Sequence, residues 1–116
     1  MKIRIKSNSV RCRLTRSDVA GLVGNGYLED SVNFDAQKLV YALKIMDEGQ
    51  LSAGFNDNTV TLFMPRNMIS ELAETDKTGF ENNNGELYLL VEKDFTCLDS
   101  VAEDQSDNYP NPLTEK

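Results

Sequence analysis

The 116 residues of this chain are enough for one compact domain, which would bury roughly two-thirds of the surface that the unfolded chain exposes. The absence of histidine excludes histidine general-base catalysis, catalytic triads built on it and most zinc sites. Two cysteines do not make a disulfide scaffold, and no apolar run suits a secretory signal or a membrane span, so we expect a cytoplasmic protein without membrane contact.

The net charge of -7 is distributed unevenly along the chain. The first sixteen residues contain no acid and six cations, which are Lys2, Arg4, Lys6, Arg11, Arg13 and Arg16. An acidic protein disfavours nonspecific binding to nucleic acid or to anionic membranes, whereas a local basic cluster can still hold one anion. We therefore expect no nucleic-acid partner.

The first predicted element is a β-hairpin over residues 2–14, with its turn at Ser7 and Asn8. The predicted register pairs Ile5 with Val10, Arg4 with Arg11, and Lys2 with Arg13. One face of this hairpin is then apolar, and the other face is wholly basic.

A short helix follows, because Thr15 and Asp18 have the spacing of a capping box. An apolar stripe formed by Val19, Leu22 and Val23 continues it, and Gly24 and Gly26 are predicted to end it. Residues 27–34 and 38–45 then read as two more strands. The first half of the chain is thus a ββαββ unit.

The second half repeats this order, with strands at 51–56 and 59–64, a helix at about 66–74, and strands at 78–81 and 86–93. Four residues recur fifty positions later: Asn8, Val10, Arg16 and Leu22 as Asn58, Val60, Arg66 and Leu72. We therefore predict a single domain over residues 1–93, made of two repeats at about 2–45 and 51–93. Residues 94–116 are rich in acids and read as a partly ordered tail.

Eight strands in two hairpin-rich copies predict an α+β fold with a mostly antiparallel sheet. We expect this sheet to curl or to close into a barrel, with both short helices packed on its outer, apolar face. The basic face then lines an interior if the sheet closes, and meets solvent if it stays open.

The candidate site is the basic hairpin face, where like charges on opposite strands repel and need compensation. Its members are Lys2, Arg4, Lys6, Arg11 and Arg13, with Lys44 and Tyr88 as further candidates for the same face. The counter-charge could be an anionic ligand such as a phosphate chain. The alternatives are internal neutralisation, by Glu29, Glu92 or the acidic tail, and a solvated face with splayed side chains. Structural ion-pair networks commonly produce such clusters, which favours these alternatives.

The two copies differ in charge at the positions of the basic hairpin face. The positions equivalent to its five cations are small, polar or aromatic in the second copy, namely Ser52, Gly54, Asn56, Thr61 and Phe63. The two copies thus share the predicted order of strands and helix, but only the first carries the five cations. This divergence favours a specialised role for the first copy.

No other motif predicts a catalytic, metal or cofactor site. The acid pairs Asp47-Glu48 and Glu103-Asp104 lack the spacing and the glycine of a calcium loop. Cys12 reads as a small core residue, and Cys97 would be reactive only if a cation such as Lys93 lowered its pKa. We therefore expect neither a metal nor a cofactor.

Two stretches of the chain resemble an uncharacterised family of short bacterial proteins. The first runs from Lys2-Ile3-Arg4-Ile5-Lys6 to Asp18, and the second from Val91-Glu92-Lys93-Asp94-Phe95-Thr96-Cys97-Leu98 to Asn111-Pro112. The resemblance implies a domain of unknown function and supplies no activity.

A duplicated strand-and-helix unit with a charged sheet face is also similar in topology to the CYTH-type triphosphate tunnel enzymes. That family opens with Glu-x-Glu-x-Lys, whose acids help to hold a catalytic metal. Only Lys6 matches this pattern here, since Lys2 and Arg4 stand in place of the two acids. The resemblance implies an antiparallel tunnel that binds polyphosphate, and the departure argues against metal-assisted hydrolysis.

Three functional hypotheses follow from the sequence. The first is a non-enzymatic domain that binds a small anion or an acidic segment through Arg4, Arg11 and Arg13. The second is a metal-dependent triphosphate hydrolase of CYTH type. The third is a structural or interaction module whose acidic tail covers the basic face of its own or a neighbouring subunit. The sequence leaves the oligomeric state open.

Overall fold

A computed structural model gives the fold and describes residues 1–95 of the chain. This part forms eight strands and two helices. In chain order they are β1 (Lys2–Lys6), β2 (Ser9–Leu14), α1 (Arg16–Asn25), β3 (Tyr27–Phe34), β4 (Gln37–Met46), β5 (Ser52–Asn56), β6 (Thr59–Pro65), α2 (Arg66–Glu74), β7 (Gly79–Asn84) and β8 (Leu87–Lys93). The predicted order of elements is confirmed.

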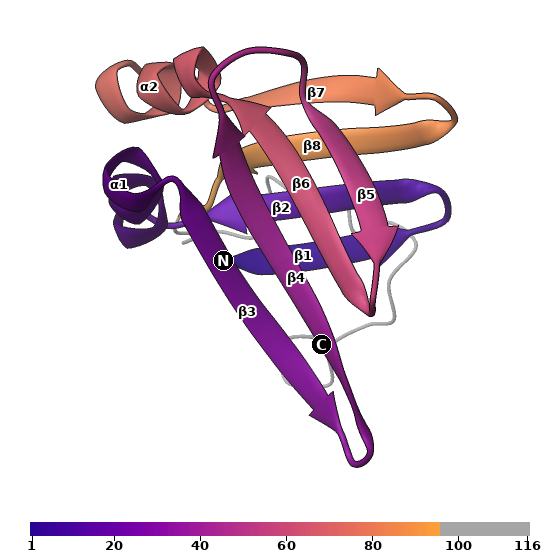
Figure 1. The fold of residues 1–116 in the computed structure, drawn as a ribbon. Helices are drawn as coiled ribbons and strands as arrows, with labels where there is room; N and C mark the ends of the chain where they lie inside the picture. Colours follow the sequence, from indigo (N-terminus) through magenta and orange to yellow (C-terminus); the bar gives the residue numbers. More distant parts are fainter. Residues whose placement is uncertain (96–116) are drawn as a thin grey trace, which may run out of the picture.

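The strands form two sheets instead of one. Sheet A has the order β1-β2-β8-β7 and sheet B the order β3-β4-β6-β5, and Figure 1 shows sheet B lying across sheet A. In each sheet two antiparallel hairpins meet along a parallel pair of strands, β2 with β8 and β4 with β6. The expected curled or closed antiparallel sheet is therefore wrong. Hydrophobic alternation predicts the hairpins, but it does not determine which hairpins lie side by side.

The duplication is confirmed in the architecture, and the two copies are interleaved. Sheet A joins the first hairpin of copy one (β1–β2) to the second hairpin of copy two (β7–β8). Sheet B joins the first hairpin of copy two (β5–β6) to the second hairpin of copy one (β3–β4). If each strand is replaced by its equivalent in the other copy, the strand order of sheet A becomes that of sheet B. Each sheet therefore contains one hairpin from each copy.

The predicted register of the first hairpin is confirmed, and it decides which face is basic. Ile3 and Ile5 pair with Cys12 and Val10, which are buried. Residues directly opposite each other on paired strands share a face, and neighbours along a strand alternate between faces. The basic side chains of β1 and β2 therefore lie on the outer surface of sheet A, away from the core.

The hydrophobic core draws on both sheets and both helices. Its buried members are Val10, Cys12, Leu14, Val19, Leu22, Leu43, Ile45, Leu51, Leu62, Met64, Ile69, Leu72, Leu89 and Val91. The helices α1 and α2 lie side by side at one end of the sheets (Figure 1), and each buries two residues in this cluster. The expectation that the helices pack on an outer face is wrong, because they extend the core instead of covering the back of a sheet.

The ends of α1 follow the sequence signals, with one difference. The Thr15 hydroxyl accepts a hydrogen bond from the Asp18 amide, and the Asp18 carboxylate accepts one from the Thr15 amide, so the capping box is confirmed. Gly24 lies inside the helix, and Gly26 alone ends it with a left-handed φ of 74°. Pro65 precedes the first residue of α2 and provides no side-chain cap.

The structure describes the first two residues of the predicted acidic tail. Asp94 and Phe95 follow β8, and the backbone amide of Asp94 donates a hydrogen bond to the carbonyl oxygen of Leu14. The rest of the tail, 96–116, lies outside the described residues. Within residues 1–95, neither helix has the length and apolarity that a membrane crossing requires.

Candidate functional site

The outer face of sheet A gathers the five basic side chains of the first hairpin. Lys2, Arg4 and Lys6 alternate along the edge strand β1, and Arg11 and Arg13 lie beside them on β2. The neighbouring strand β8 contributes Tyr88 opposite Ser9, Leu90 opposite Arg11, and Glu92 opposite Arg13. Tyr88 thus shares the basic face, as the sequence suggested.

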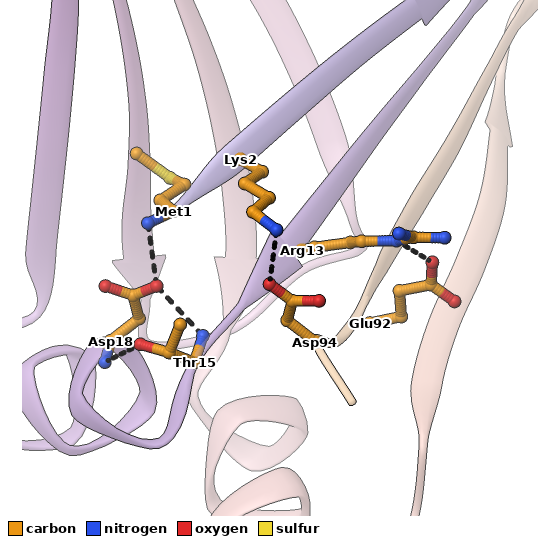
Figure 2. Close-up of polar contacts among 7 residues, drawn as sticks. All are labelled: Met1, Lys2, Arg13, Thr15, Asp18, Glu92 and Asp94. Atoms are coloured by element: carbon orange, nitrogen blue, oxygen red, sulfur yellow. Dashed lines mark hydrogen bonds and ion pairs between the residues drawn. The ribbon is translucent and has the colours of Figure 1, made fainter. Parts of the chain in front are cut away.

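Internal acids neutralise part of this cluster. Glu92 interacts with both arginines of β2: Arg11 Nε donates to Glu92 Oε2 in a short contact, and Arg13 Nε donates to the same oxygen at 3.1 Å. Both arginine side chains are two-thirds buried, which strengthens the pairing. Lys2 Nζ lies 3.2 Å from Asp94 Oδ2, and Figure 2 shows this pair close to the Arg13–Glu92 pair.

Two of the counter-charges that the sequence suggested reach this cluster within residues 1–95, namely Glu92 and the first residue of the predicted tail, Asp94. Glu29 lies on β3 in sheet B and accepts a hydrogen bond from the Tyr27 hydroxyl at 2.7 Å. The parallel pairing of β2 with β8 explains why Glu92 lies on this face, because it brings Glu92 directly opposite Arg13. This pairing joins residues about eighty positions apart, so sequence alone could not identify it.

Two cations of the cluster, Arg4 and Lys6, have no ion pair within residues 1–95. They line a depression of about 260 Å³ on the outer surface of sheet A. Its other lining residues are Ser9, Val10, Arg11, Tyr88 and Leu90. The depression thus combines two exposed cations, a third that is already paired, and a phenol.

Tyr88 is oriented by a neighbour that sequence reasoning did not single out. Its hydroxyl donates a hydrogen bond to Glu81 Oε1 at 2.6 Å. This hydrogen bond, with some desolvation, raises the pKa of Tyr88, so the phenol stays protonated near neutral pH. The alternation of β7 and β8 is the only sequence signal for this contact, since it places Glu81 on the same outer face.

Lys44 does not join the cluster. It lies on β4 in sheet B, where it pairs with Tyr27 and Phe63. The second-copy equivalents of the five cations lie on the outer face of the same sheet, on β5 and β6. The two outer faces therefore occupy equivalent places in the fold, and they differ in charge.

The structure also contains a cavity that the sequence did not predict. It measures about 570 Å³ and lies where the two helices approach the ends of β2 and β8. Apolar side chains such as Leu14, Val19, Leu72 and Phe95 line it. Lys93 Nζ donates a hydrogen bond to the carbonyl oxygen of Thr75 across this region, at 2.9 Å. Charged side chains line the cavity as well, namely Arg16, Asp76, Lys93 and Asp94.

Cys12 and Asp47 show no sign of a catalytic or metal-binding role. Burial raises the pKa of Cys12 to about 12, so its thiol is protonated and unreactive. Asp47 lies 3.4 Å from Arg66 Nε on the surface. No group of three or more carboxylate or cysteine ligands is present within residues 1–95. The predicted candidates Cys97 and Glu103-Asp104 lie outside these residues.

Comparison with known proteins identifies a family. The model of a family of unknown function, DUF7009, matches residues 1–113, so the chain belongs to that family. No curated protein matches the chain, and no solved structure matches it. No matching structure therefore supports the suggested likeness to the triphosphate tunnel enzymes. The two open sheets do not form a tunnel.

Proposed function

We propose that this member of the DUF7009 family binds a small phosphate-like anion on the outer face of sheet A. The binding residues are Arg4, Lys6 and Arg11, and Tyr88 and Leu90 line the same depression. The observation that carries the proposal is the pair of cations without a carboxylate partner in residues 1–95, beside three cations that have one.

The geometry supports a ligand with more than one anionic group. Arg4 and Arg11 are directly opposite each other on β1 and β2, where like charges repel and an anion between them relieves the repulsion. Arg11 uses Nε for Glu92, so its terminal nitrogens remain available to a phosphate oxygen. Lys6 lies two positions further along β1, on the same face, and adds a point charge to the same depression.

The proposed activity is binding without chemistry. Within residues 1–95 no carboxylate lines the depression, so this part of the chain offers no ligand set there for a catalytic metal of the kind that tunnel enzymes hold. The one nearby phenol has a raised pKa and makes a poor general base at neutral pH. The face supports recognition of charge, and its exposure makes that recognition sensitive to salt.

Titration calorimetry with pyrophosphate and tripolyphosphate at low ionic strength tests the proposal. We expect binding to the parent chain, and a loss of at least tenfold in affinity in the double variant Arg4→Gln, Lys6→Gln. The matched control is Lys38→Gln, Lys44→Gln, which removes two exposed cations from sheet B and should bind as the parent does. No measurable binding by the parent, or equal weakening in both double variants, would refute the proposal.

A further inference from the structure

Equivalent rows of side chains on the core sides of the two sheets are buried to different extents. The row on the core side of sheet A consists of Ile5, Val10, Leu89 and Asn82. Its equivalent in sheet B consists of Phe55, Val60, Tyr41 and Asp30. In the middle of the rows Val10 and Leu89 are at most 8% exposed, whereas Val60 and Tyr41 are only half-buried. The residues at the edge strands are exposed in both sheets, Ile5 to 60% and Phe55 to 70%. The middle of the sheet B row is thus less covered than the middle of the sheet A row.

The less covered surface continues toward the turn between β3 and β4. These strands are longer than their equivalents β7 and β8, and Figure 1 shows their hairpin projecting past the edge strand β1. The extra length carries Val32 opposite Leu39, followed by Phe34, which is 59% exposed. We call this surface the overhang, and define it by Val32, Phe34, Leu39, Tyr41, Phe55 and Val60.

The corresponding edge on the other side of the molecule is joined. The Asn82 side chain donates to the carbonyl oxygen of Leu51, and the Asn84 side chain accepts from the amide of Ala53, both at 2.8 Å. These contacts connect β7 in sheet A to the start of β5 in sheet B. Within residues 1–95 no hydrogen bond connects the equivalent edge strands β1 and β3. The overhang thus lies beside an edge that this part of the chain leaves open.

We infer that residues 96–116 of the same chain dock on the overhang. The described chain ends just after Asp94, which is held by Lys2 and Leu14 near the start of β1. Twenty-one residues in extended form reach about 70 Å, roughly twice the length of the ten-residue strand β4. Large exposed apolar patches next to an open sheet edge are typical of surfaces that are covered in the working protein.

The sequence of this segment fits the surface in two ways. It offers apolar side chains to the overhang, namely Leu98, Val101, Tyr109 and Leu113. It also carries five acids and one lysine, while the edge strand β1 carries the cations Arg4 and Lys6 on the outer face of sheet A. Apolar burial would hold the segment in place, and charge attraction would favour this edge over the others. The inference stands on these features, and does not depend on anion binding.

A tryptophan reporter tests the inference in the full-length chain, which has no tryptophan of its own. Tyr109→Trp is the first reporter and Val101→Trp the second. Two positions are used because one side chain of a docked segment can still face solvent. We expect at least one reporter to emit at shorter wavelength in the native chain than in urea. Combining it with Val32→Ser, Phe34→Ser should move the emission back toward the unfolded value.

The control combines the same reporter with Val23→Ser, Met46→Ser, which removes two exposed apolar side chains outside the overhang. This pair should leave the native emission unchanged. Solvent-exposed emission from both reporters would overturn the inference, and so would an equal response to the two double variants. A blue shift that disappears on dilution would show docking onto a second copy, and would overturn the assignment to the same chain.

Discussion

The side-chain amide of Asn82 donates a hydrogen bond to the carbonyl oxygen of Leu51 at 2.8 Å. Leu51 is fully buried and immediately precedes β5, whereas Asn82 lies on the edge strand β7 of the other sheet. The contact therefore ties the two sheets together along one edge, where the backbone of Leu51 has no strand partner of its own.

Replacing Asn82 with alanine should weaken the fold. Loss of this partly buried hydrogen bond leaves the Leu51 carbonyl without its donor, and we expect the free energy of unfolding to fall by about 1–2 kcal/mol. Urea denaturation followed by circular dichroism measures the change. Asn83→Ala, one residue away on the exposed outer face, is the control and should stay within about 0.5 kcal/mol of the parent. Equal losses in both variants would contradict the role of the contact.

Gly79 should tolerate no side chain. A β-carbon at this position would lie 2.7 Å from the carbonyl oxygen of Val91 and 2.8 Å from Cβ of Glu92. We expect Gly79→Ala to destabilise the protein by about 1–3 kcal/mol, since the strand must shift to relieve the overlap. Gly54→Ala on the edge strand β5 meets only a ring carbon at 3.8 Å and should be neutral or slightly stabilising. Thermal melts of the two variants should therefore move in different directions or by clearly different amounts.

The local elements were predictable because their signals lie within a few residues of each other. The hairpin register, the Thr15–Asp18 capping box and the glycine that ends α1 all follow from short-range pattern and turn chemistry. The pairing of β2 with β8 was not predictable in this way. It joins distant parts of the chain in parallel, and the alternation of each strand is compatible with several neighbours.

The same reason limits prediction of the candidate site. The basic face of the first hairpin was evident from Arg4 and Arg11, which the register places directly opposite each other. Glu92 was one of several acids that could have been the counter-charge, and only the parallel pairing places it beside Arg13. Lys44 was assigned to this face on the assumption of a single sheet, and the second sheet takes it elsewhere.

Stability should depend on the ionisation of Asp18. Burial acts to raise the pKa of this carboxyl, but hydrogen bonds from the Met1 ammonium, at 2.8 Å, and from Thr15 outweigh it and lower the pKa below its ordinary value of 3.8 (Figure 2). The charged form is then favoured in the folded state. Its contribution is complete above the unfolded pKa and is lost as the pH falls through the lowered, folded pKa.

The variant Asp18→Asn tests this dependence. Near pH 7 it should be less stable than the parent by about 1 kcal/mol, the usual size of a capping interaction. The difference should shrink as the pH falls below 3.8, where the parent loses the same charge. Urea midpoints between pH 2.5 and pH 7 measure it, and Asp35→Asn in an exposed turn should follow the parent throughout. A constant difference at every pH would contradict the ionisation argument.

Glu92 should have opposite effects on stability and on anion binding. Glu92→Gln removes the carboxylate that Arg11 and Arg13 share and leaves two partly buried cations side by side, so we expect a loss of roughly 1–2 kcal/mol that high salt reduces. The same change frees positive charge next to the depression, so affinity for tripolyphosphate should rise several-fold at low salt. Chemical denaturation and calorimetry on one preparation measure both quantities, with Glu48→Gln as an exposed control. A variant that loses stability without gaining affinity would show that Glu92 only neutralises the arginines, and that the depression beside them does not recognise anions.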